Sequence, residues 1–89
     1  MSYFRCKLHG QNFAQPDGHT MRVNFYTMRW VEAASDDLAA ERAIEIVNRQ
    51  IEENGIRRSK STDATLEVEE VAEVDADAYK PNADAFVFY

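Results

Sequence analysis

The first third of the chain carries two segments in which apolar and polar residues follow a strand pattern. From Tyr3 to His9 the two kinds of residue alternate, which is typical of a strand with one buried side. Met21–Ala33 is rich in β-branched and aromatic residues, which favour strands. We therefore predict a pair of strands connected by a loop over Gly10–Thr20, in which Pro16-Asp17-Gly18 indicates a turn.

The middle of the chain changes to a helical period. Ser35-Asp36-Asp37 is typical of a helix start, because a side-chain oxygen can accept a free backbone N–H and acidic residues favour the positive end of the helix dipole. Asn54-Gly55 is a typical helix end, since glycine suits the left-handed position there. Between these signals one apolar stripe is predicted from Ala40, Ala43, Ile44, Val47 and Ile51.

The last third predicts two strands within polar connections. Thr65–Glu69 alternates like a strand, and Ala85–Tyr89 is a short apolar run. Glu70–Val74 stays open between strand and helix, because valines at every third position also fit a helix. The stretches 56–63 and 75–84 are predicted to be a polar linker and a loop.

Together these elements predict a single domain over residues 1–89 with the order β-β-α-β-β. The fold class is α+β with two layers: a four-stranded, mainly antiparallel sheet and one long helix on one face. A domain this small buries only about 60% of the surface that its unfolded chain exposes, so pairing with a second copy would add stability.

The sheet face opposite the predicted helix is the first candidate binding surface. It is predicted to carry Tyr3, Tyr26, Met28, Trp30, Val87 and Tyr89, bordered by Arg5 and Lys7. One helix covers one face, so this face is expected to bind a protein partner or a second copy in a homodimer. Scattered surface aromatics, or cover by the Gly10–Thr20 loop, are the alternatives. Strict alternation places Arg29 on the helix side, although its long side chain can instead reach water near the strand end.

The charge is the second feature that suggests a surface. The net charge is −6, and residues 61–89 hold eight acidic residues but only one basic residue. Glu67, Glu69 and Glu73 are the candidate contacts to a basic partner, as in an inhibitor or immunity-type protein that blocks a basic surface of an enzyme. The alternative is a solvated strand edge, whose charges prevent aggregation. An acidic chain disfavours nucleic acid as a partner.

The residues with reactive side chains form no recognisable motif. Cys6 is predicted to face the core with Phe4 and Leu8, where a thiol is inert. His9, Asp17 and His19 could bind zinc, but their spacing matches no metal motif, and two solvated histidines are expected instead. The sequence therefore predicts no cofactor, no metal and no enzymatic activity.

The sequence also indicates the compartment. A lone cysteine forms no internal disulfide, charges interrupt the N-terminal region where a signal peptide needs an apolar core, and no apolar run approaches the ~20 residues that cross a bilayer. A cytoplasmic location without membrane contact is expected.

Three segments resemble a group of short uncharacterised bacterial proteins: Arg5–Phe13, Phe25–Ala33 and Phe86–Tyr89. The resemblance covers the two predicted hairpin strands, the helix start and the last strand, and it implies no activity. We therefore expect a small non-enzymatic protein-interaction module. An inhibitor is the alternative, and a small enzyme or an RNA-binding domain is the second alternative; aromatic residues beside basic ones can stack RNA bases, but an RNP-like motif is missing.

Overall fold

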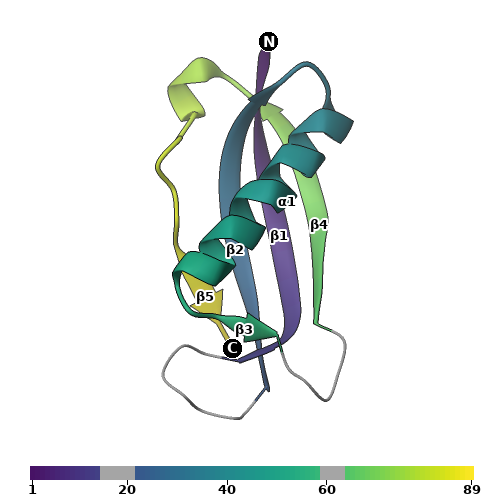
Figure 1. Cartoon of the computed structure of the whole chain (residues 1–89). Helices are drawn as coiled ribbons and strands as arrows, with labels where there is room; N and C mark the ends of the chain where they lie inside the picture. The colour runs from purple at the N-terminus through teal and green to yellow at the C-terminus, as the bar shows by residue number, and fades with distance from the viewer. Residues whose placement is uncertain (15–21, 59–63) are drawn as a thin grey trace.

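The computed structural model describes residues 1–14, 22–58 and 64–89. The elements are β1 (Ser2–Ala14), β2 (Arg22–Ala33), α1 (Asp36–Glu53), β3 (Arg57–Arg58), β4 (Thr65–Val74), the 3-10 helix η1 (Ala76–Ala78) and β5 (Phe86–Phe88). All strand pairs are antiparallel, and the main order across the sheet is β4-β1-β2-β5, with β3 beside the end of β1 (Figure 1). The predicted α+β fold is confirmed.

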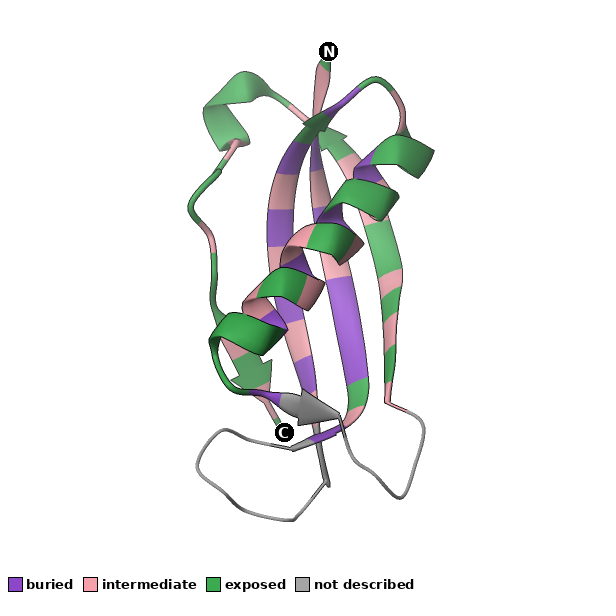
Figure 2. Ribbon diagram, in the orientation of Figure 1, coloured by how far each residue is buried: buried purple, intermediate pink, exposed green. Residues whose placement is uncertain are grey.

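Helix α1 lies diagonally across one face of the sheet, and this face holds the core (Figures 1 and 2). Its buried residues are Ala39, Ala43, Val47 and Ile51. A step of four residues rotates by only about 40° around a helix, so these four form one stripe. The predicted stripe was partly wrong: it omitted Ala39, and it included Ala40 and Ile44, which are only half-buried beside the stripe.

The helix begins and ends where the sequence predicts. The Ser35 hydroxyl accepts a hydrogen bond from the backbone N–H of Leu38 at 3.3 Å, and two aspartates occupy the first turn. Asn54 is the C-cap, and Gly55 follows it with a φ of 72°, a left-handed conformation that favours glycine.

Strand β1 is longer than the sequence predicts. A loop was expected from Gly10, but β1 continues to Ala14. Gln11 and Asn12 stand opposite a single residue of β2, and Asn12 has a φ of 65°, so the strand contains a β-bulge. The bulge turns Phe13 to the helix side, where it is fully buried. It therefore interrupts the alternation by which a strand is recognised.

Gly10 is needed where it stands because Phe25 packs directly over it. The two residues are cross-strand partners. A Cβ atom at position 10 would lie 2.3 Å from two ring carbons of Phe25, much closer than van der Waals contact allows. The glycine thus makes room for an aromatic ring at the centre of the core.

A second bulge explains the ambiguity over Glu70–Val74, which is strand. Leu8 pairs with Val68 and Cys6 pairs with Val71, so one extra residue lies between these two positions of β4. The extra residue gives two inward-facing valines a spacing of three, which imitates a helix.

The connections also differ from the prediction at two places, and the first is the stretch 75–84, which was expected to be a loop and contains the 3-10 helix η1. The stretch 56–63 was expected to be a polar linker, yet Ile56 is buried in the core and Arg57–Arg58 pair with Phe13 and Ala14 as strand β3. The predicted turn at 16–18 lies outside the described residues. No helix in the described part of the chain has the length and apolar character needed to cross a membrane.

We predict that Ile51→Ala destabilises the domain by about 2–5 kcal/mol, because it removes burial and leaves a cavity under α1. Ile51 is 3% exposed, whereas Leu38 on the same helix is 50% exposed. Leu38→Ala is therefore the matched control, with an expected change below about 0.5 kcal/mol. Urea unfolding measures both, and equal losses would contradict the packing described here.

Candidate binding groove on the open sheet face

Strand pairing gathers most of the predicted aromatic face on the side of the sheet opposite α1. Tyr26, Met28 and Trp30 project from β2, and their partners on β1 are His9, Lys7 and Arg5. On the other side of β2, Val87 pairs with Tyr26, and the backbone of Tyr89 exchanges two hydrogen bonds with Asn24. Alternation within each strand puts all of these side chains on one face.

A groove of about 460 Å³ lies on this face. Tyr26, Met28 and Trp30 form its floor, and the chain at 83–85 together with Val87 lines one side. Lys7 and Lys80 also line it. This volume lies within the usual range of ligand-binding pockets, which combine apolar walls with a few polar groups.

The side of the groove is held in place from the helix side of the sheet. The Thr27 hydroxyl donates a hydrogen bond to the carbonyl of Ala85 at 2.6 Å, and Arg29 donates to the same oxygen at 3.4 Å. Arg29 also donates to Oε1 of Gln50 at 2.8 Å. Two side chains of β2 thus fix the chain just before β5, and Gln50 of α1 holds one of them, Arg29, in place.

Arg29 is 2% exposed, so the suggestion that it reaches water is wrong and strict alternation decides its side. Burial lowers the pKa of Arg29, and the charge of Asp84 opposes that shift. The desolvation of the guanidinium is offset by its hydrogen bonds, although its Nη2 atom has no partner among the described residues.

Two lysines lie against the aromatic floor. Nζ of Lys7 is 4.8 Å from the ring centroid of Tyr26, and Nζ of Lys80 is 5.2 Å from that of Trp30. Both distances fit cation–π contacts. Sequence reasoning placed Lys7 at the border of this face but missed Lys80 and Asp84, because a polar loop gives no signal of the strand on which it lies.

Tyr3 belongs to the open face but not to the groove. Its ring lies 4.7 Å from that of Tyr79, which follows η1. The segment after β4 therefore crosses this face and covers Tyr3. The Gly10–Thr20 loop was the segment expected to provide such cover; in its described part, residues 10–14 are strand.

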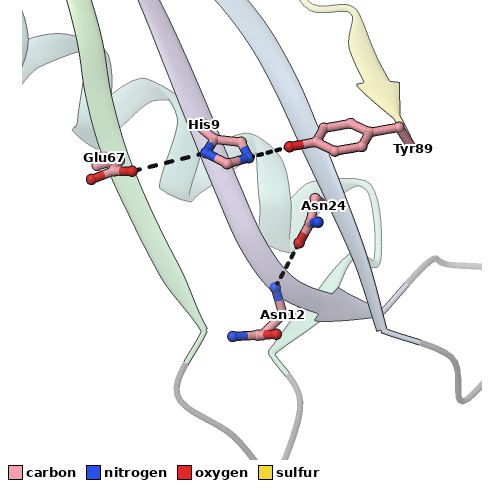
Figure 3. Close-up of polar contacts among 5 residues, drawn as sticks. All are labelled: His9, Asn12, Asn24, Glu67 and Tyr89. Carbon is pink, nitrogen blue, oxygen red and sulfur yellow. Dashed lines mark hydrogen bonds and ion pairs between the residues drawn. The ribbon is translucent and has the colours of Figure 1, made fainter.

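His9 is buried between aromatic rings, contrary to the expectation of a solvated histidine. It is 8% exposed and stacks on Tyr26 at 4.6 Å. Its Nε2 shares a hydrogen bond of 2.5 Å with the Tyr89 hydroxyl, and its Nδ1 lies 3.8 Å from Oε1 of Glu67 (Figure 3). The alternation along β1 predicted that His9 lies on this face, but His9 becomes enclosed only because β5 and the following Tyr89 approach it. Asp17 and His19, the other two candidate metal ligands, lie outside the described residues.

This hydroxyl, imidazole and carboxylate do not form an activated nucleophile. The Glu67 contact is longer than a hydrogen bond, and none of the three residues lines the groove. Partial burial, then the neighbouring Tyr26 and the charge of Glu69, raise the pKa of Tyr89, which disfavours the phenolate form of its hydroxyl. The cluster instead fastens the end of the chain to the sheet. Within the described ranges, no three His, Cys, Asp or Glu side chains are grouped to hold a metal ion.

The acidic candidates share a strand but not a face. Glu67, Glu69 and Glu73 are all exposed on β4, whose outer side has no partner strand in the described part of the chain. Glu67 faces His9 on the open side, Glu69 lies in the bulge, and Glu73 is the partner of Phe4 on the helix side. A partner would therefore contact them along the edge of the sheet.

Cys6 is fully buried, as predicted. Its Sγ lies 3.8 Å from the carbonyl oxygen of Ala39, to which the thiol is a weak donor. Burial raises the pKa of Cys6 from 9.0 to about 11.

Comparison with family models, with curated proteins and with solved structures finds no match to this chain. The function is therefore inferred from the geometry of the groove and of the acidic edge.

We predict that a disulfide reagent does not modify native Cys6 at about pH 8, because only about one thiol in a thousand is ionised there and none is accessible. Unfolding in urea should give complete reaction.

The raised pKa of Cys6 also favours the folded state below pH 9.0, and this contribution is lost as the pH rises toward about 11. In urea unfolding over the same pH range, the free energy of unfolding of Cys6→Ala should therefore fall less than that of the wild type. Rapid labelling of the native protein would contradict the assignment.

Proposed function

We propose that this chain is a non-enzymatic protein-binding domain that receives a partner on its open sheet face. The observation that carries the proposal is the groove of about 460 Å³ floored by Tyr26, Met28 and Trp30. Tryptophan, tyrosine and methionine are enriched at the centres of protein interfaces, and buried aromatic anchors carry most of their binding energy. The partner is a different protein or a second copy of the chain.

Binding is favoured over catalysis by what lines the groove. Its ionisable groups are Lys7, Lys80, Asp84 and Tyr26. Both ammonium groups lie over aromatic rings. Ammonium groups held over aromatic rings suit the orientation of a bound chain.

We predict that peptides selected from a random-peptide library on the wild-type domain lose at least about tenfold in affinity for Trp30→Ala, because the central anchor is removed. Leu38→Ala, which changes an exposed apolar residue on the helix, should leave the affinity unchanged. Fluorescence polarisation measures both. Selected peptides that bind Trp30→Ala as tightly as the wild type would reject the groove as the binding surface.

Light scattering over a range of concentrations tests the second copy as the partner. A wild-type dimer that Trp30→Ala converts to a monomer assigns the face to self-association. A wild-type monomer leaves a different protein as the partner.

The acidic edge supports a second candidate, an inhibitor that blocks a basic surface of another protein. Glu67, Glu69, Glu70 and Glu73 are all exposed along β4. Only Glu70 forms a close ion pair with an arginine among the described residues, at 2.8 Å from Arg5. Among the described residues, Glu67 has only the 3.8 Å contact with His9, and no ion pair is formed by Glu69 or Glu73. Such an acidic surface increases the rate of association with a cationic partner.

We predict that a lysine-rich peptide binds the wild type and that the triple variant Glu67→Lys, Glu69→Lys and Glu73→Lys abolishes this binding. Binding should also weaken as salt shortens the Debye length from about 10 Å at 0.1 M to about 3 Å at 1 M. Reversing Glu41, Glu45 and Glu52, exposed residues of α1, is the matched control for net charge. Equal losses in both variants would show that only the net charge matters.

A further inference from the structure

The two lysines of the groove indicate the charge of its ligand. Among the described residues the ion pairs are Arg5–Glu70 and His9–Glu67, so neither Lys7 nor Lys80 is matched with a described carboxylate. Asp84 is the acidic residue that lines the groove. Its charge acts on the buried Arg29, which reduces its repulsion toward a bound anion.

The spacing of the lysines suggests the length of the ligand. Lys7 lies over Tyr26 and Lys80 over Trp30, two residues that are four positions apart on one strand. A strand rises about 3.3 Å per residue, so the Cα atoms of Tyr26 and Trp30 are about 13 Å apart along the groove. Each of these two rings has one ammonium group over it, and an extended peptide with two acidic residues four positions apart matches the spacing of the rings.

The groove floor between the two lysines indicates the chemistry of the central part of the ligand. Met28 lies between the two rings, and the adjacent side of the groove is formed by Ala83, Ala85 and Val87. These apolar side chains exclude water, the charge of Asp84 on the same side acts on the buried Arg29, and methionine adapts its shape to different apolar groups. The centre of the ligand is therefore apolar.

We propose that the groove binds an extended peptide segment in which apolar residues are flanked by two acidic residues four positions apart. This inference rests on the proposed function and adds the chemistry of the partner. Each acidic residue pairs with one lysine, and the apolar side chain midway between them, which faces the groove with the two acids, contacts the floor of Tyr26, Met28 and Trp30.

Nucleic acid and a second copy fit these observations less well. A nucleic acid carries a phosphate at every nucleotide, whereas the groove offers two lysines beside an acidic edge in a chain of net charge −6. A second copy placed face to face would bring equivalent lysines into the same interface, where like charges repel.

The test uses Trp30 as the probe, because it is the only tryptophan in the chain. Titrations of its fluorescence compare the acetylated and amidated peptide Glu-Leu-Phe-Leu-Glu with versions whose two end residues are Gln or Lys. The acidic peptide should shift the emission of Trp30 and bind about tenfold more tightly than the Gln version, since it alone forms two pairs with lysines.

Paired variants assign the effect to the two lysines. Lys7→Gln combined with Lys80→Gln should reduce the affinity for the acidic peptide about tenfold and leave the Gln peptide unaffected. Arg42→Gln combined with Arg49→Gln changes the net charge equally at exposed positions of α1, and it should reduce the affinity less than about twofold.

Several results would overturn the proposal. These are the absence of any response to the acidic peptide, equal affinity for the Gln peptide, or tighter binding of the Lys peptide. Binding of a short oligouridylate in place of the peptide would assign the groove to RNA, and concentration-dependent burial of Trp30 without any peptide would assign it to a second copy. The affinity of the library-selected peptides for Trp30→Ala decides the proposed function separately, because their selection on the wild-type domain places no condition on the charge of the peptides.

Discussion

A single amphipathic helix can cover only one side of a sheet, and this limit determines the rest of the structure. Strand β2 is apolar on both sides over much of its length, so its pairing with β1 creates two faces that exclude water. Helix α1 covers the face with Phe25 and Val31, both almost fully buried. The face with Met28 and Trp30 lies away from the helix, and the polar segment that precedes β5 packs beside it. That segment covers part of it and leaves a groove.

The two faces are connected through the final strand. Phe86 and Phe88 pack against the core on the helix side, while Val87 between them lines the groove on the other side. Thr27 and the buried Arg29 bind the carbonyl of Ala85 from the helix side. The shape of the groove therefore depends on polar contacts within the core, and the burial of a guanidinium is explained by the chain segment that it positions.

The distribution of charge gives the two candidate surfaces different roles. The exposed glutamates of β4 repel one another when two such edges approach, which disfavours edge-to-edge pairing of two copies. The groove on the open face is lined by two lysines and is separated from that edge by β1. The acidic edge suits a cationic surface, and the groove suits an apolar segment with flanking acids, so the same partner is not required to engage both.

The sequence by itself determined the elements that depend on local chemistry. The helix cap at Ser35, the helix end at Gly55 and the alternation along β2 each follow from neighbouring residues. These local signals also predict the α+β class and the side chains of β2 that lie on the open face. Tertiary structure alone decided the bulges that extend β1 and β4, because an extra residue breaks the very alternation by which a strand is recognised. It also decided the groove, since Lys80 meets Trp30 only after the chain returns across the sheet, and no local pattern encodes a contact between segments so far apart in the sequence.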